Sequence, residues 1–212
     1  MNEMKITLID RSDPAACMTA AGLCYNAKDP YKALLNAIEC GHESVMEHCK
    51  FTFLIEGVSR VLLAQLTRHR IASFSVQSQR YCGADLELVI PETIIQAGAL
   101  KETQKLAEHV NIVYDHLLSK GVPQEDARYF TLQGGMTKLT MTMNVRELRH
   151  FFSLRCCNRA QWEIRHMADE MLRVCRKEIP FMFDKAGPGC VNTGCPEGKR
   201  SCDNPRRDEE WN

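Results

Sequence analysis

The chain of 212 residues carries 27 Lys and Arg against 27 Asp and Glu, and 44% of its residues are hydrophobic. This composition is that of a globular protein with one sizeable core, and it argues against general disorder and against a general nucleic-acid binder. No apolar run approaches the ~20 residues that cross a bilayer, so we expect no membrane association. The 11 cysteines occur without a signal-like apolar segment near the first residue, so we expect reduced thiols and a cytoplasmic location.

Five elements are predicted in the first 68 residues. Weak alternation predicts a strand over Lys5–Asp10, and the first helix is predicted over residues 14–25. A second helix is predicted over residues 30–40, because each of these two begins with an Asp-Pro pair that supplies an N-cap and a first-turn proline. Aromatic and β-branched residues predict a strand over Cys49–Gly57. Apolar residues at helical spacing then predict a helix over residues 58–68.

Five further elements are predicted after the first 68 residues. A short strand is expected over Leu86–Ile90, where Pro91 ends it, and a long helix over residues 92–119. Alternation with period two predicts a strand with one apolar face over residues 137–144. Two more helices are expected, over residues 145–156 and 159–179.

The order of these elements mixes strands and helices without a regular strand–helix–strand repeat. We therefore expect an α+β fold, with a mixed or antiparallel sheet packed by helices, in one domain over residues 1–183. Residues 184–212 are rich in Cys, Gly and Pro and form a predicted C-terminal tail. Thiolates of Cys190, Cys195 and Cys202 have a spacing that zinc could use, but a structural zinc site takes four ligands and no fourth is local. We therefore expect reduced thiols and no metal.

The charge distribution is uneven although the total is neutral. Residues 57–84 contain no Asp or Glu, yet they hold Arg68-His69-Arg70 and, further on, Ser78 and Arg80. If the segment that contains Ser78 and Arg80 is extended, these two side chains project to the same face, where a hydroxyl and a guanidinium can hold one phosphate. The alternative is that the arginines cap the C-terminal carbonyls of the preceding helix. Spacing alone leaves both interpretations open.

The same segment resembles a known signature. R-H-R, seven residues and then S is the motif of the flavin-dependent thymidylate synthases, and RHRIASFSVQSQRY is similar to it. Further blocks resemble that family in matching order. They are Gly41–Ser44 with Glu47-His48, Glu125–Arg128, Asn144–Leu148, and Leu154-Arg155 followed by Ala160–Arg165.

The resemblance implies an activity and a set of ligands. Members of the family convert dUMP to dTMP, taking a methylene group from methylenetetrahydrofolate and a hydride from FADH2, which NADPH regenerates. Arg155 corresponds to the family arginine that stabilises a deprotonated pyrimidine N3 and so makes C5 nucleophilic, which makes it the predicted catalytic residue. No enzyme nucleophile is expected, because Ser78 has no general base beside it in the sequence.

The resemblance also implies two sets of binding residues. The expected dUMP contacts are Gln65, Arg68, Ser78, Gln79, Arg80, Arg128 and Arg155. The expected FAD contacts are Ser44, Arg68, His69, Arg70, Asn144, Arg146 and His150.

The family assembles as homotetramers whose active sites lie between subunits. By the resemblance, Arg68 and Arg128 would come from one subunit and Ser78, Arg80 and Arg155 from its neighbour.

Two other functions remain possible from the sequence: an oxidoreductase on the same fold with another pyrimidine substrate, and a nucleotide- or RNA-binding module that uses the arginine patch. Such a module would bind polynucleotide in a salt-sensitive way and carry no flavin.

Overall fold

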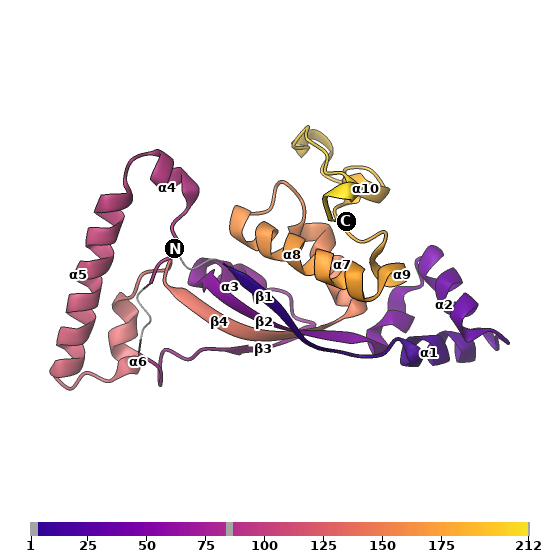
Figure 1. Cartoon of the computed structure of the whole chain (residues 1–212), viewed down its shortest axis with the longest axis horizontal. Coiled ribbons are helices and arrows are strands. Elements are labelled where there is room, and N and C mark those ends of the chain that lie inside the picture. The colour runs from indigo at the N-terminus through magenta and orange to yellow at the C-terminus, as the bar shows by residue number, and fades with distance from the viewer. Residues whose placement is uncertain (1–3, 84–86, 212) are drawn as a thin grey trace. The chain divides into compact units, whose positions relative to one another are not determined.

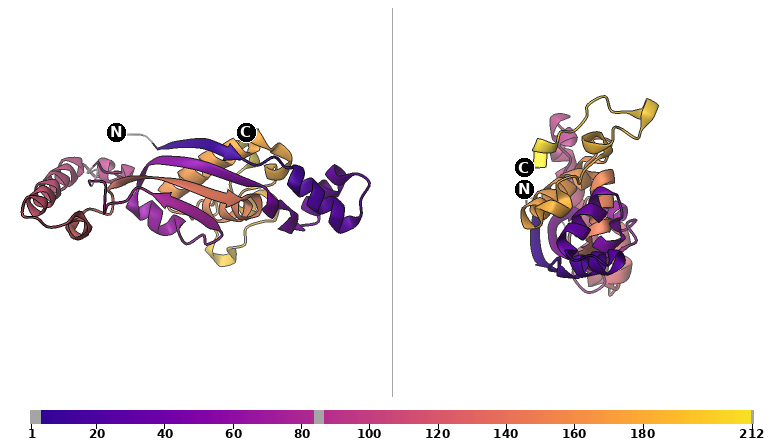
Figure 2. Two further views of the ribbon diagram at one scale, coloured as in Figure 1. Left: turned by 90° about the horizontal axis from the view of Figure 1, so that it is seen from below. Right: turned by 90° about the vertical axis from the view of Figure 1, so that its right-hand side faces the viewer.

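The computed structural model describes residues 4–83 and 87–211. Within these residues, four strands form one sheet in the order β1-β2-β4-β3 (Figure 1), and Figure 2 shows them side by side. The strands are β1 (Lys5–Arg11), β2 (Lys50–Ser59), β3 (Ala72–Val76) and β4 (Met136–Asn144). β2 and β4 run antiparallel, because Val145 N–H donates to Cys49 O at one end and Arg60 N–H donates to Gly135 O at the other. The α+β class with an antiparallel sheet is confirmed.

Helices occupy most of the remaining described residues. In chain order they are α1 (Ala15–Tyr25), α2 (Pro30–Glu39), η1 (Glu43–His48), α3 (Arg60–Leu66), α4 (Glu92–Gln96), α5 (Leu100–Ser119), α6 (Gln124–Ala127), η2 (Arg128–Phe130), α7 (Val145–Arg155), α8 (Trp162–Glu178), α9 (Pro180–Phe183), α10 (Gly189–Asn192), η3 (Gly198–Arg200) and η4 (Asp208–Trp211), where η marks a 3-10 helix. None of the helices in the described ranges is both long and apolar enough to span a membrane.

Three predicted elements differ from the structure. The single helix predicted over residues 92–119 is wrong: Gly98 adopts a φ of 71°, and this left-handed residue separates α4 from α5. The strand predicted over Leu86–Ile90 is reduced to one antiparallel bridge between Leu88 and Gly135, and Leu86 lies outside the described residues. The helix predicted from residue 159 begins at Trp162, because the side chain of Gln161 caps it by accepting from two backbone N–H groups.

Contacts divide the chain into two compact units. Unit 1 comprises Met1–Lys5, Ile55–Arg68 and Ser75–Leu139, and unit 2 comprises Ile6–Leu54, His69–Phe74 and Thr140–Asn212. In unit 1, α5 packs against α6 and ends at Ser119, the residue at which the sequence predicted the helix to end, and Gly121 just beyond it adopts a φ of 82°. The predicted apolar face of β4 is buried at Leu139 in unit 1 and at Met141 and Met143 in unit 2.

The core of unit 2 is built from aromatic side chains of β2, α7 and α9. Phe51 meets Phe183 edge to face at 5.5 Å between ring centroids, and Phe152 meets the same ring at 6.1 Å. All three side chains are fully buried. Their rings fix the position of α7 within the unit, and α7 carries several of the predicted site residues.

The predicted C-terminal tail is part of unit 2 in this structure. Its last described side chain, Trp211, is only 1% exposed. The guanidinium of Arg176 on α8 lies over the Trp211 ring, and it also binds Asp208 Oδ1 at 2.6 Å. The domain boundary after Phe183 stays a prediction, but residues 206–211 pack on α8.

Candidate functional site

Arg155 is the last residue of α7, and a buried histidine holds its side chain. Arg155 Nε donates to His69 Nε2 at 3.0 Å, and His69 Nδ1 lies 3.2 Å from Glu147 Oε1. His69 is 5% exposed and Glu147 is 8% exposed. The side chain of Asn144 accepts from Glu147 N–H and so caps the helix that carries Glu147 and Arg155. One chain of contacts therefore runs from the start of α7 to its end.

These contacts fix the protonation state of His69. A guanidinium only donates, so Nε2 must be the acceptor and Nδ1 must carry the proton that is donated to Glu147. Burial lowers the pKa of His69, the charge of Arg155 lowers it further, and Glu147 opposes both. The imidazole is therefore neutral near pH 7 and orients Arg155 without repelling it.

A second set of contacts joins α7 to η1. Arg149 Nε donates to Glu43 Oε1 at 2.9 Å, and Arg146 pairs with Glu47 one turn earlier. The structure thus brings together two sequence blocks, the one around Glu43–His48 and the one that begins at Asn144. Ser44 is exposed on η1.

Two cavities lie within unit 2 beside these residues. One, of about 370 Å³, is lined by Glu43, Arg149, His150 and Lys185 among others, and the His150 ring lies 6.3 Å from that of His69. The other, of about 300 Å³, is lined by Arg155 and by parts of the C-terminal tail. Cys190, Cys195 and Cys202 also line it, but the described residues contain no group of three His, Cys, Asp or Glu that could hold a metal ion.

The motif serine lies in unit 1, and it is not on a strand. β3 ends at Val76, and Ser78 Oγ accepts from the backbone N–H of Arg80 at 3.2 Å in a tight turn. The extended geometry that would place Ser78 and Arg80 on one face is therefore wrong. The Ser78 hydroxyl accepts from a backbone N–H two residues on, and this local hydrogen bond stabilises a turn instead of strand pairing.

Two predicted arginines meet at one acidic residue in unit 1. Arg80 binds the Glu125 carboxylate through Nε at 2.9 Å and Nη2 at 2.8 Å, and Arg128 Nε donates to the Glu125 backbone carbonyl at 3.1 Å. This joins the motif to the block that contains Arg128. The expectation that Arg80 and Arg128 act from different subunits stays a prediction.

Arg60, another arginine of the segment 57–84 that contains no Asp or Glu, belongs to the same surroundings. Its Nη2 donates to Gln77 O at 3.0 Å, whereas its Nε is buried without a partner among the residues the structure describes. Burial lowers the pKa of Arg60, and the nearby charge of Arg128 lowers it further. Two guanidiniums whose charges act on each other favour an anion close by.

The other predicted residues of the motif lie around α3 and the turn after β3. Gln65 and Gln79 are half-buried, whereas Arg68 and Arg70 are exposed. In the part of the chain that is described, the side chains of Arg68 and Arg70 donate to no carbonyl of α3, and Thr67 Oγ1 takes that role at Leu63 O. The described contacts therefore give no support to helix capping by these arginines, and the anion site stays a prediction.

Comparisons with known proteins show the family to which the chain belongs. A family model described as thymidylate synthase complementing protein matches residues 7–181. A flavin-dependent thymidylate synthase from Geobacter sulfurreducens is 44% identical over 217 residues, which cover 94% of each chain. The chain belongs to the flavin-dependent thymidylate synthase family. Another member, from Pyrococcus furiosus, is 47% identical over 181 residues that cover 80% of this chain and 74% of that one.

A solved structure shares the fold of this family member. The UMP/dUMP methylase PolB from Streptomyces cacaoi, crystallised with 5-Br dUMP, superposes with a TM-score of 0.78 at 23% identity, covering 87% of this chain and 94% of that one. The family model and the curated relatives confirm the family that the sequence resembles. Sequence reasoning missed Glu147, Arg149 and Glu125 as partners of the site, although each lies within or beside a block that resembles the family.

Proposed function

We propose that the protein methylates dUMP to dTMP, with methylenetetrahydrofolate as the carbon donor and NADPH as the reductant. The observation that carries this proposal is the contact between the R-H-R motif and Arg155, because a neutral, buried His69 orients the guanidinium. Family membership supports the same reaction. A fixed cation aimed at charge that develops on a substrate is usually the largest single catalytic contribution.

Arg155 has the central role in this mechanism. Its guanidinium stabilises negative charge when the pyrimidine N3 is deprotonated, and the charge delocalised in the ring makes C5 the nucleophile toward the methylene carbon. No protein nucleophile is then needed. The environment of Ser78 supports this, because its hydroxyl accepts from Arg80 N–H and the described structure places no His, Asp or Glu in hydrogen-bond contact with it. We therefore assign Ser78 to substrate binding.

The phosphate of dUMP would bind in unit 1. Ser78 and Arg80 of one subunit and Arg128 of its neighbour would supply donors there, and Gln65, Arg68 and Gln79 complete the proposed set with Arg155. Glu125 holds Arg80 in place in this structure, so the two charges of a phosphate would compete with Glu125 for the guanidinium.

The residues of unit 2 fit FAD. Its pyrophosphate needs cations and hydrogen-bond donors: Lys185 and His150 line the cavity beside Glu43, and Arg146 lies in the first turn of α7, where it pairs with Glu47. Ser44, Arg68, His69, Arg70 and Asn144 would complete the contacts. When bound, the reduced flavin supplies the hydride that converts the transferred methylene to methyl.

We also propose the homotetramer with shared active sites. Large aromatic side chains next to two proposed dUMP residues support it: Tyr129 is 80% exposed beside Arg128, and Tyr81 is 78% exposed beside Arg80. Apolar groups this exposed at a binding surface favour burial against another chain.

The proposal predicts a yellow protein. Purified protein should release FAD on denaturation, and NADPH should bleach its flavin absorbance faster when dUMP is present. A matched sample with 2′-deoxyuridine in place of dUMP should show no acceleration, because deoxyuridine differs from dUMP only by lacking the phosphate. Absence of released FAD, together with no rebinding on reconstitution, would overturn the proposal. A colourless protein with salt-sensitive polynucleotide binding would favour the binding module instead.

A further inference from the structure

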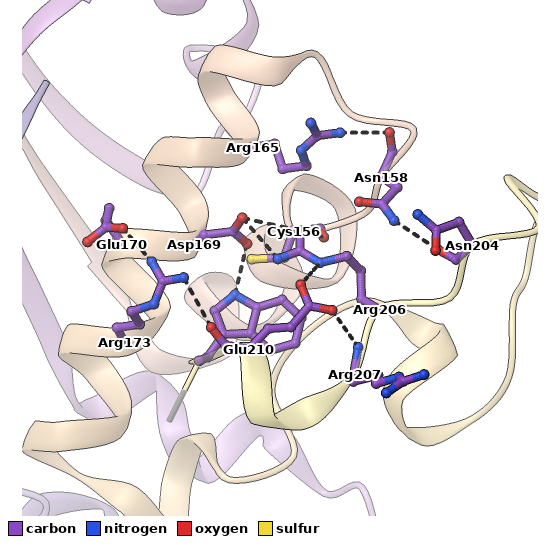
Figure 3. A network of polar contacts seen from close by, with 11 residues as sticks. Cys156, Asn158, Arg165, Asp169, Glu170, Arg173, Asn204, Arg206, Arg207 and Glu210 are labelled. Carbon is purple, nitrogen blue, oxygen red and sulfur yellow. Dashed lines mark hydrogen bonds and ion pairs between the residues drawn. The ribbon is translucent and has the colours of Figure 1, made fainter.

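Arg206, in the C-terminal tail, lies at the centre of a polar network that reaches Cys156 (Figure 3). Its guanidinium binds Asp169 Oδ2 of α8 through Nη1 at 3.2 Å and Nη2 at 3.1 Å, and its Nε binds Glu210 Oε2 at 2.5 Å. Its Nη1 also donates to the backbone carbonyl of Cys156 at 3.1 Å. One side chain therefore joins the tail, α8 and the end of α7.

The burial of this network shows that it is not a surface ion pair. The side chains of Arg206 and Asp169 are 9% and 12% exposed, and the Arg206 guanidinium lies 4.7 Å from the centroid of the Trp211 ring. Trp211 Nε1 donates to the second oxygen of Asp169 at 2.8 Å. Burial opposes the charge of Arg206, but Asp169 and Glu210 outweigh it and hold the pKa of the guanidinium above its usual value. The cation is therefore permanent and fixed in direction.

The Cys156 carbonyl connects the Arg206 network to the end of α7, where Arg155 lies. Cys156 is the C-cap of α7 and follows Arg155 directly. Carbonyls at the end of a helix lack intrahelical partners and attract cations. Nearby, Asn158 Nδ2 donates to the backbone carbonyl of Asn204 at 2.8 Å, so the tail holds the loop after α7 at a second point.

We propose that residues 204–211 are a positioning element for Arg155, with Arg206 as its principal residue. Arg155 is then held from two sides: His69 orients its guanidinium, and Arg206 fixes the peptide that follows its Cα. The family model ends at residue 181, so this element lies outside the matched segment. The proposal rests on the proposed function for its catalytic consequence, but the positioning itself does not depend on it.

The experiment compares Arg206→Lys with Arg207→Gln. Lysine keeps a charge opposite Asp169 and Glu210, but a single ammonium does not reproduce the fork that reaches both carboxylates and the Cys156 carbonyl. Arg207 is the matched control, because it is the next residue, it is exposed, and its two hydrogen bonds with Glu210 use its backbone N–H and carbonyl. We expect Arg206→Lys to retain bound FAD and to slow methylation at saturating substrate roughly tenfold or more, whereas Arg207→Gln retains the wild-type rate.

A double-mutant cycle distinguishes positioning from general destabilisation. Dissociation constants of dUMP are measured for wild type, Arg206→Lys, Arg155→Ala and the double variant, each per mole of folded protein. If Arg206 acts through Arg155, Arg206→Lys weakens dUMP binding in the wild type and has almost no further effect once Arg155 is absent. An equal loss in both backgrounds, or a wild-type rate in Arg206→Lys, would overturn the proposal.

A readout that is independent of the reaction completes the test. Amide hydrogen exchange in residues 153–161 should accelerate in Arg206→Lys and stay unchanged in Arg207→Gln, whatever substrate the enzyme uses. If Arg206→Lys folds poorly, Trp211→Phe replaces it, because this change keeps a ring but removes the Nε1 donor to Asp169. Unchanged exchange in both variants would contradict the positioning role, whereas failure of wild-type methylation alone would contradict only the proposed function.

Discussion

Arg155→Ala is expected to lower the rate of dUMP methylation by a factor on the order of 10²–10³ while FAD stays bound. The variant removes the cation that stabilises charge on the pyrimidine. Asn144 still caps α7, and the Glu147 carboxylate still holds His69. Arg155→Lys should also be slow, since a point charge does not replace a planar fork that His69 orients through Nε. Single-turnover rates at saturating dUMP, with FAD content as the control, measure the effect.

Ser78→Ala separates the two proposed roles. It removes a hydrogen-bonding group and should keep measurable activity, well above that of Arg155→Ala. A wild-type rate in either Arg155 variant would refute the role of the guanidinium. A covalent adduct between dUMP and Ser78, detected by mass spectrometry, would show that the reaction uses an enzyme nucleophile after all.

Mixing two inactive variants is expected to restore activity if active sites are shared between subunits. Arg128→Ala and Arg155→Ala each inactivate the sites to which the altered chain contributes. In a mixed pair, one site carries both defects and the other carries neither. After subunit exchange, activity should return to at most about a quarter of wild type for random pairing in a two-site dimer unit.

The control for this prediction is the exchange itself. Native mass spectrometry of isotope-labelled subunits shows whether mixed assemblies have formed. If they have formed and the activity stays at the level of the separate variants, Arg128 and Arg155 serve the same site from one chain.

Local signals made most element boundaries predictable. Asp29 was expected to cap α2 and does so, accepting from Lys32 N–H at 3.1 Å. The alternation in β4 predicted a buried face, and Met141 and Met143 are 0% and 1% exposed. Such signals act over a few residues, so the sequence displays them directly. The break between α4 and α5 at Gly98 was not predicted. A single glycine within a helical pattern is usually tolerated, and the sequence does not show that the backbone of Gly98 takes a positive φ.

The contacts of the site depend on residues far apart in the sequence. His69 lies 78 residues from Glu147 and 86 residues from Arg155, so no periodicity relates them. The motif resemblance assigned His69 to FAD and Arg155 to dUMP, and it did not predict that the two side chains bind each other. The contact between the tail and α8 is a similar case. Arg206 and Asp169 are separated by 37 residues, and neither lies in one of the short sequence blocks that resemble the family.

The function is tested most directly by following the methylene carbon of an isotopically labelled methylenetetrahydrofolate. The protein is incubated with dUMP, NADPH and FAD, and the nucleotides are analysed by mass spectrometry. The proposed reaction predicts labelled dTMP that requires FAD, NADPH and folate together and that is nearly absent with Arg155→Ala. Recovery of unchanged dUMP from protein that retains bound FAD, or labelled dTMP formed at the same rate without FAD or without Arg155, would contradict it.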